Sequence, residues 1–145
     1  MLSKDFKEFI ELLNKHQVKY LIVGGYAVAL HGYPRYTKDL DFWIENSHEN
    51  ASSLLKALDE FGFGSLGLQI SDFMEPDMII QLGYPPERID ICTTLTGLSF
   101  SDCYPLRREI FIDQLMVNFL DKDNLIKNKL STGKLQDISD AEKLK

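Results

Sequence analysis

A pair of glycines and three aspartates are the residues of this chain whose types and spacing could do chemistry. Gly24 and Gly25 follow a short apolar run, Asp39 and Asp41 lie two residues apart in Asp-Leu-Asp-Phe-Trp-Ile, and Asp90 lies in Arg-Ile-Asp-Ile. Adjacent glycines allow a tight strand-to-helix turn and let backbone N–H groups approach a phosphate. Because strand side chains alternate, Asp39 and Asp41 share a face. Paired carboxylates repel each other, and a bound divalent cation commonly offsets this repulsion. The pattern therefore predicts a site for a metal ion and a phosphate.

Each part of this pattern also has a simpler explanation. The glycine pair could be an ordinary turn, because neither the P-loop nor the Rossmann spacing is present. Asp39 and Asp41 could be exposed carboxylates on an edge strand, although their apolar neighbours make ionised acids costly without cations. Asp90 could simply be a salt-bridge partner of Arg88. The ordered combination is more specific than any one part alone.

The elements that position these residues can be predicted from periodicity and turn signals. The expected fold class is α+β, with a mixed, mainly antiparallel sheet flanked by helices and no strict alternation of strands and helices. Residues 32–38 and the glycine-rich stretch 62–67 are expected to be loops, the latter with a strand edge as the alternative. We expect helices at 2–13 (capped by Ser3), 26–31, 54–61, 99–104 (a short helix or a turn), 121–130 and 136–144. We expect strands at 20–23, 39–44, 78–82, 88–92, 109–112 and 115–119.

Composition narrows the class of protein. The 145 residues are expected to form a single domain, 1–145, with a net charge of −6. That charge argues against a broad cationic surface for duplex DNA or an anionic membrane. The two cysteines are too few for a disulfide framework, and no apolar run approaches the length of a membrane span. The N-terminal pattern is that of an amphipathic helix and not of a signal peptide, so a cytoplasmic location is expected.

With these residues identified, the chain resembles the minimal nucleotidyltransferases of the DNA polymerase beta-like superfamily. The signature of that family is a hydrophobic residue and Gly-Gly or Gly-Ser, then about ten to thirteen residues, then Asp-hydrophobic-Asp/Glu. Here it reads Val23-Gly24-Gly25 and Asp39-Leu40-Asp41, and Asp90 fits the third carboxylate strand. The segment Arg35-Tyr-Thr37-Lys-Asp39 also looks like a variant found in the AbiEii-toxin-like and related bacterial branch.

The C-terminal part of the chain is similar to the tail of these proteins. Lys129 and the segment from Gly133 to Asp140 follow the pattern Lys … Gly-Arg-x-Lys-Asp-x-x-Asp. Two positions depart from it, because Lys134 replaces the usual Arg and Gln136 the usual Lys. A point charge therefore stands where a two-point guanidinium clamp for phosphate is expected.

The resemblance implies a nucleotidyltransferase fold and a function. It implies transfer of a nucleoside monophosphate from a nucleoside triphosphate to a hydroxyl on a protein or RNA acceptor, with two Mg²⁺ ions (Mn²⁺ possible) as cofactors. A cognate partner protein could supply the acceptor. By the same resemblance, the catalytic metal ligands are Asp39, Asp41 and Asp90, and the nucleotide contacts are Gly24, Gly25, Arg35, Thr37 and Lys129.

Two other hypotheses remain open from sequence. The chain could be a catalytically weak or inactive binding module of a toxin–antitoxin-type pair that keeps the fold. It could also be a structural domain in which the three acids have no chemical role. Because of the altered tail, the hypothesis of a binding module stays open beside the hypothesis of an active enzyme.

Overall fold

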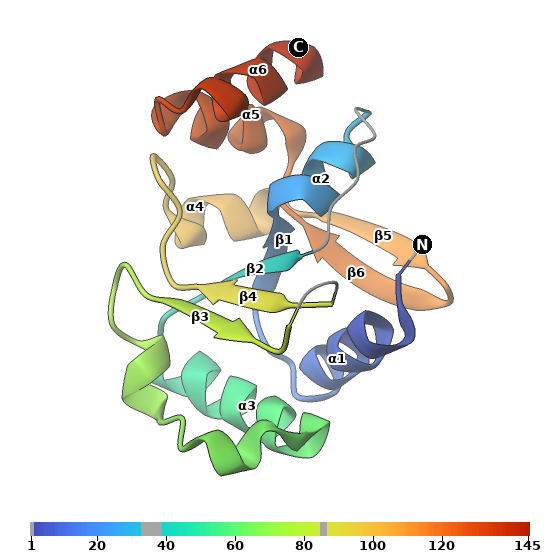
Figure 1. Ribbon diagram of the computed structural model, residues 1–145, viewed down its shortest axis with the longest axis vertical. Helices are drawn as coiled ribbons and strands as arrows, with labels where there is room; N and C mark the ends of the chain where they lie inside the picture. The colour runs from blue at the N-terminus through green and yellow to red at the C-terminus, as the bar shows by residue number, and fades with distance from the viewer. Residues whose placement is uncertain (1, 33–38, 85–86) are drawn as a thin grey trace.

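A six-stranded mixed sheet forms the centre of the computed structural model, which describes residues 2–32, 39–84 and 87–145 (Figure 1). The strand order is β3-β4-β2-β1-β6-β5, and three of the five neighbouring pairs are antiparallel. The predicted α+β class with a mainly antiparallel mixed sheet is therefore confirmed. The strands are β1 (Tyr20–Val23), β2 (Leu40–Ile44), β3 (Ile79–Leu82), β4 (Ile89–Cys92), β5 (Arg108–Ile112) and β6 (Leu115–Phe119).

Two of the α-helices begin at capping side chains that were candidates from the sequence. Ser3 accepts a hydrogen bond from the backbone N–H of Phe6, and Asp121 accepts one from Asn124, so each satisfies an N–H group that has no partner within the helix. Ser3 was the predicted cap, and Asp121 was one of two candidates from sequence, the other being Asp123. The helices are α1 (Lys4–Lys15), α2 (Gly24–Leu30), α3 (His48–Leu58), α4 (Phe100–Cys103), α5 (Lys122–Ser131) and α6 (Leu135–Leu144).

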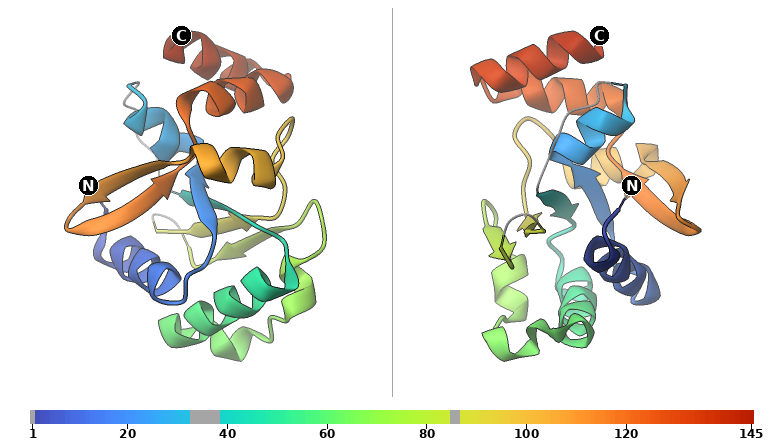
Figure 2. Two further views of the ribbon diagram at one scale, coloured as in Figure 1. Left: turned by 180° about the vertical axis from the view of Figure 1, so that it is seen from behind. Right: turned by 45° about the vertical axis from the view of Figure 1, so that its right-hand side comes forward.

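Two faces of the sheet carry different elements. Phe42 of β2 packs its ring edge-on against Phe9 of α1, whereas Trp43, on the other face, packs against Phe100 of α4. The helices α1 and α3 contact each other, while α5 and α6 pair at the opposite end of the molecule (Figures 1 and 2). The face of β2 that carries Asp41 and Trp43 is therefore directed away from α1.

The β5–β6 hairpin and the break after α3 follow local turn chemistry. Asp113 and Gln114 both have positive φ, 51° and 66°, as expected for a two-residue hairpin turn whose twist matches that of the strands. The helix predicted over 54–61 ends at Leu58 and continues as a wider turn, Asp59–Phe63, in which Gly62 has a φ of 106°. Short 3₁₀ turns follow at Gly64–Leu66 and Ile70–Phe73, and not a strand edge.

No helix in the described ranges is long and apolar enough to cross a lipid bilayer. Most of the expected loop at 32–38 lies outside the described residues.

Candidate active site

Asp39, Asp41, Arg88 and Asp90 lie together on one face of two neighbouring strands. β2 and β4 are parallel, with Leu40 beside Ile89 and Asp41 beside Asp90. Side chains two residues apart on a strand share a face. Asp39 therefore lies on the same face as Asp41, and Arg88 on the same face as Asp90. We call the three aspartates the acid cluster. The register of two strands far apart in sequence brings the three predicted carboxylates together.

Arg88 bridges two of the three carboxylates. Its Nε donates to Oδ1 of Asp90 at 2.8 Å, and its Nη2 donates to Oδ2 of Asp90 at 3.0 Å and to Oδ2 of Asp39 at 2.8 Å. The side chains are half-buried, with exposed fractions of 27% for Arg88, 31% for Asp39 and 14% for Asp90. The simpler explanation of Asp90, a salt bridge to Arg88, is thus correct and coexists with the clustering of the acids.

Asp41 is the third carboxylate, and within residues 2–32, 39–84 and 87–145 it forms no ion pair. Burial, then the charges of Asp90 and Asp39 and a hydrogen bond with Asp90, raise the pKa of Asp41 to about 7, while Lys129 opposes the rise. Burial is the largest cause of this rise, and repulsion from the other two carboxylates adds to it. A cation beside Asp41 would therefore lower its pKa and favour the ionised form.

The backbone of Gly24 lies close against the carboxylate of Asp41. It has a φ of 69°, which glycine adopts without strain, and a Cβ atom built on it would overlap the carboxylate of Asp41. α2 begins at Gly24 itself, two residues earlier than predicted. The glycine is therefore required both by the backbone conformation and by the close approach of the acid. Gly25 is buried within the first turn of this helix.

A cavity of about 370 Å³ opens between the acid cluster and the α5–α6 pair. Asp41, Asp90 and Cys92 contribute from the sheet, and the helical wall carries both lysines, Lys129 and Lys134. Sequence reasoning missed several polar lining residues because they belong to no motif: Gln81, Thr94, Thr96, Asn128 and Thr132. Burial and the charges of Asp41 and Asp90 raise the pKa of Cys92 to about 12, so its thiol is protonated and is no nucleophile.

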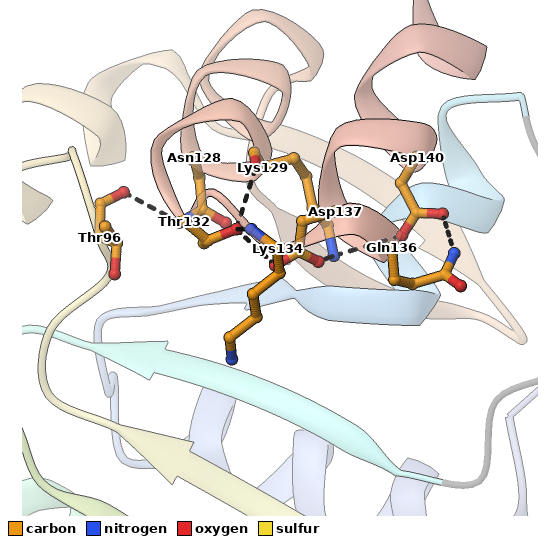
Figure 3. Close-up of polar contacts among 8 residues, drawn as sticks. All are labelled: Thr96, Asn128, Lys129, Thr132, Lys134, Gln136, Asp137 and Asp140. Carbon is orange, nitrogen blue, oxygen red and sulfur yellow. Dashed lines mark hydrogen bonds and ion pairs between the residues drawn. The ribbon is translucent and has the colours of Figure 1, made fainter.

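Lys129, predicted to contact the nucleotide, is held in an ion-pair network within the helix pair. Its Nζ lies 3.1 Å from Oδ1 of Asp137 and 3.6 Å from Oδ2 of the fully buried Asp140 (Figure 3). Burial by itself raises the pKa of Asp137, but hydrogen bonds from Thr132 and Lys129 together hold it below its ordinary value. Gln136 donates to Asp140 at 2.9 Å. Lys129 thus joins α5 to α6 at the cavity wall.

Lys134 is placed differently. Its side chain extends from the start of α6 toward the strands below (Figure 3), and among the residues that the structure describes its Nζ makes no hydrogen bond or ion pair. The position where the family pattern has Arg therefore supplies a cation to the cavity. Arg35 and Thr37, the other predicted nucleotide contacts, lie outside the described residues.

The donor types of the acid cluster fit a divalent cation, but their present arrangement does not. Carboxylate oxygens are the ligands that Mg²⁺ prefers, and the charges of Asp90 and Asp39 add to the effect of burial in raising the pKa of Asp41. Within residues 2–32, 39–84 and 87–145, however, no group of three His, Cys, Asp or Glu side chains is placed to hold one ion. Arg88 occupies oxygens of two of the three acids.

The fold is that of the nucleotidyltransferases. A protein from Thermotoga maritima assigned as a nucleotidyltransferase superposes with a TM-score of 0.65 at 14% identity, over 95% of this chain and 88% of that one. The antibiotic-resistance factor ANT(2″)-Ia, in complex with adenylyl-2″-tobramycin, gives 0.56 at 12% identity over 96% and 90% of the two chains. The lincosamide adenylyltransferase LnuA, bound to lincomycin, gives 0.54 at 15% identity over 100% and 99%.

Sequence comparison points to the same class. Residues 5–73, just under half of the chain, match the family model of aminoglycoside-2″-adenylyltransferase, a stretch that contains Gly24, Asp39 and Asp41. No curated protein matches the chain. The family match and the fold together indicate a nucleotidyltransferase, as the sequence predicts. The finer AbiEii-toxin-like assignment stays a prediction.

Proposed function

We propose that this chain transfers a nucleoside monophosphate from a nucleoside triphosphate to a hydroxyl group, with Asp39, Asp41 and Asp90 as metal ligands. The observation that carries the proposal is the register that places Asp41 beside Asp90 beneath a glycine that leaves no space for a side chain. Mg²⁺, held by these carboxylates, would supply Lewis-acid stabilisation of the transferring phosphoryl group.

The chain's own residues would bind and orient the nucleotide. Lys134 reaches the cavity with an ammonium group that suits a polyphosphate, in place of a guanidinium clamp. By the family resemblance, the backbone N–H groups of Gly24 and Gly25 would donate to phosphate oxygens. Lys129 keeps α5 and α6 together, which positions Lys134 over the sheet. Arg35 and Thr37 remain expected contacts on the basis of sequence alone.

Adenosine triphosphate is the donor we favour, and a small hydroxyl-bearing molecule is the acceptor. The matched family model and LnuA are adenylyltransferases by name, and LnuA corresponds to this chain over nearly its whole length. A chain of about this length can therefore include a binding site for a small-molecule acceptor. The protein or RNA hydroxyl expected from sequence is the alternative acceptor.

Calorimetric titration of the four nucleoside triphosphates with Mg²⁺ tests the proposal without knowledge of the acceptor. Wild type should bind one of them, and Asp41→Asn should not, because it loses the carboxylate nearest Gly24. Incubation with radiolabelled ATP and separate pools of hydroxyl-bearing antibiotics, RNA and cell protein then identifies the acceptor class. Absence of nucleotide binding by wild type would refute the proposal.

A second function, a binding module without catalysis, is favoured by one observation. Arg88 already satisfies Asp39 and Asp90, as expected in a site that has given up its metal. If Asp41→Asn leaves binding to a partner protein intact and wild type shows no nucleotide binding, the module is the better description.

A further inference from the structure

Arg88 is matched to the acid cluster more closely than a surface ion pair requires. Its guanidinium makes a two-point contact with Asp90 and a third hydrogen bond to Asp39, with all three distances between 2.8 and 3.0 Å. Arg is charged at every accessible pH, and its planar group fits carboxylates in this two-point manner. Most of the Arg88 side chain is withdrawn from solvent, so screening weakens these contacts less than at the surface.

The oxygens that Arg88 uses are those that a divalent cation would need. Both carboxylate oxygens of Asp90 and Oδ2 of Asp39 accept hydrogen bonds from it. A doubly charged ion at these oxygens would lie against the guanidinium and repel it strongly. Arg88 and a cation shared by Asp39 and Asp90 therefore exclude each other.

We propose that Arg88 is a built-in counter-cation that holds Asp39 and Asp90 in the metal-free protein and must leave them before a divalent ion binds. This inference rests on the proposed function, because it assumes that the acid cluster is a cation site. Its consequence is that Arg88 lowers the affinity for the free ion. The enzyme then loads its metal only when the ion arrives at high concentration or together with a nucleotide.

The register places Arg88 where such a release is feasible. It directly precedes β4, and the backbone N–H of Leu40 donates to its carbonyl oxygen at 3.0 Å, so the backbone stays anchored to β2. Only the long side chain has to move, and it is the part that is 27% exposed. Release of the side chain thus requires no change in the sheet.

Binding of Mn²⁺ alone, measured from the electron paramagnetic resonance signal of the free ion, tests the inference without turnover. Arg88→Gln should bind Mn²⁺ about tenfold or more tighter than wild type, because the ion no longer has to break charge-assisted hydrogen bonds. Arg88→Lys, which keeps the charge but not the two-point fork, should lie between the two. Arg108→Gln is the matched control, since it removes the same charge at the exposed start of β5, which is separated from β4 by three strands. It should bind as wild type does.

The outcomes separate the two proposals. If wild type binds Mn²⁺ and Asp41→Asn does not, but Arg88→Gln and Arg88→Lys bind no tighter than wild type, the role of Arg88 is refuted and the metal site stands. If neither wild type nor any Arg88 variant binds Mn²⁺ at millimolar concentration, the cation site itself is refuted, and the inference with it. Should Arg88→Gln fail to fold, as judged by circular dichroism, Arg88→Lys decides: equal or weaker binding than wild type overturns the inference.

Discussion

At the scale of single residues, Asp41 is the group whose ionisation opposes folding. Its pKa of about 7 exceeds the ordinary value of 3.8, so the folded protein holds a proton that the unfolded chain releases between these two values. Stability therefore falls as pH rises from about 4 to about 7, and then levels off. The full difference corresponds to roughly 4 kcal/mol as an upper bound, since each pH unit contributes about 1.4 kcal/mol.

Asp41→Asn should accordingly stabilise the metal-free protein at pH 8. We expect a rise in Tm of about 5–10 °C, because about 1 kcal/mol shifts the Tm of a domain of this size by about 2–4 °C. The rise should shrink toward zero near pH 4, where the carboxyl is neutral in both states. Scanning calorimetry across pH 4–8 checks this, and a constant difference at every pH would contradict it.

Asp137 is expected to show the opposite sign. Despite its partial burial, Thr132 and Lys129 hold its pKa below the ordinary value, so its ionised form supports folding above that value. That support is lost as pH falls through the depressed pKa. Asp137→Asn should therefore lower Tm at pH 7, and the deficit should narrow in acid. A Tm equal to that of wild type at pH 7 would show that the network around Lys129 adds nothing to stability.

At the scale of elements, the junction of β1 and α2 is constrained by Asp41 on the neighbouring strand. Gly24→Ala imposes a left-handed conformation on a residue with a side chain, at a cost of about 1–2 kcal/mol, and its Cβ also collides with the Asp41 carboxylate. We expect nucleotide binding to be lost as Asp41 is displaced. Gly67→Ala separates the two effects, because Gly67 has a similar φ of 74° with no atom within 4 Å of a Cβ.

The comparison is made by thermal melting and nucleotide titration. Gly67→Ala should lose stability but keep wild-type affinity, whereas Gly24→Ala should lose both. Equal affinities in the two variants would show that the close approach to Asp41 is not needed for binding.

Local elements and the β5–β6 hairpin were readable from the sequence, but the pairing of strands far apart in the chain was not. The hairpin at Asp113-Gln114 and the caps at Ser3 and Asp121 depend on neighbouring residues only, so periodicity and turn chemistry suffice. The parallel pairing of β2 with β4 depends on contacts between residues almost fifty positions apart. Which carboxylate faces which, and the placement of Arg88 beside Asp39, follow from that pairing and have no local signal.

At the scale of the whole molecule, the cavity exists because the α5–α6 pair is held over the face of the sheet that carries Asp41. Asn128 of α5 donates to the carbonyl oxygen of Thr96, in the segment after β4, at 2.9 Å (Figure 3). The family pattern marked Lys129 and Lys134 alike as tail residues. Only the packed helices show that the first is held in an ion-pair network while the second reaches the cavity.

Lys134 should therefore matter for binding and not for folding. Lys134→Gln removes the ammonium group that extends into the cavity, and we expect about a tenfold weaker affinity for ATP with Mg²⁺, as for loss of one charge-assisted contact to phosphate. Tm should stay within about 2 °C of wild type, because such surface substitutions change stability by about 0.5 kcal/mol or less. Lys122→Gln, at the exposed start of α5, removes the same charge outside the cavity and should leave affinity unchanged. If both variants weaken binding equally, the effect is one of net charge, and Lys134 does not take the place of the family's arginine.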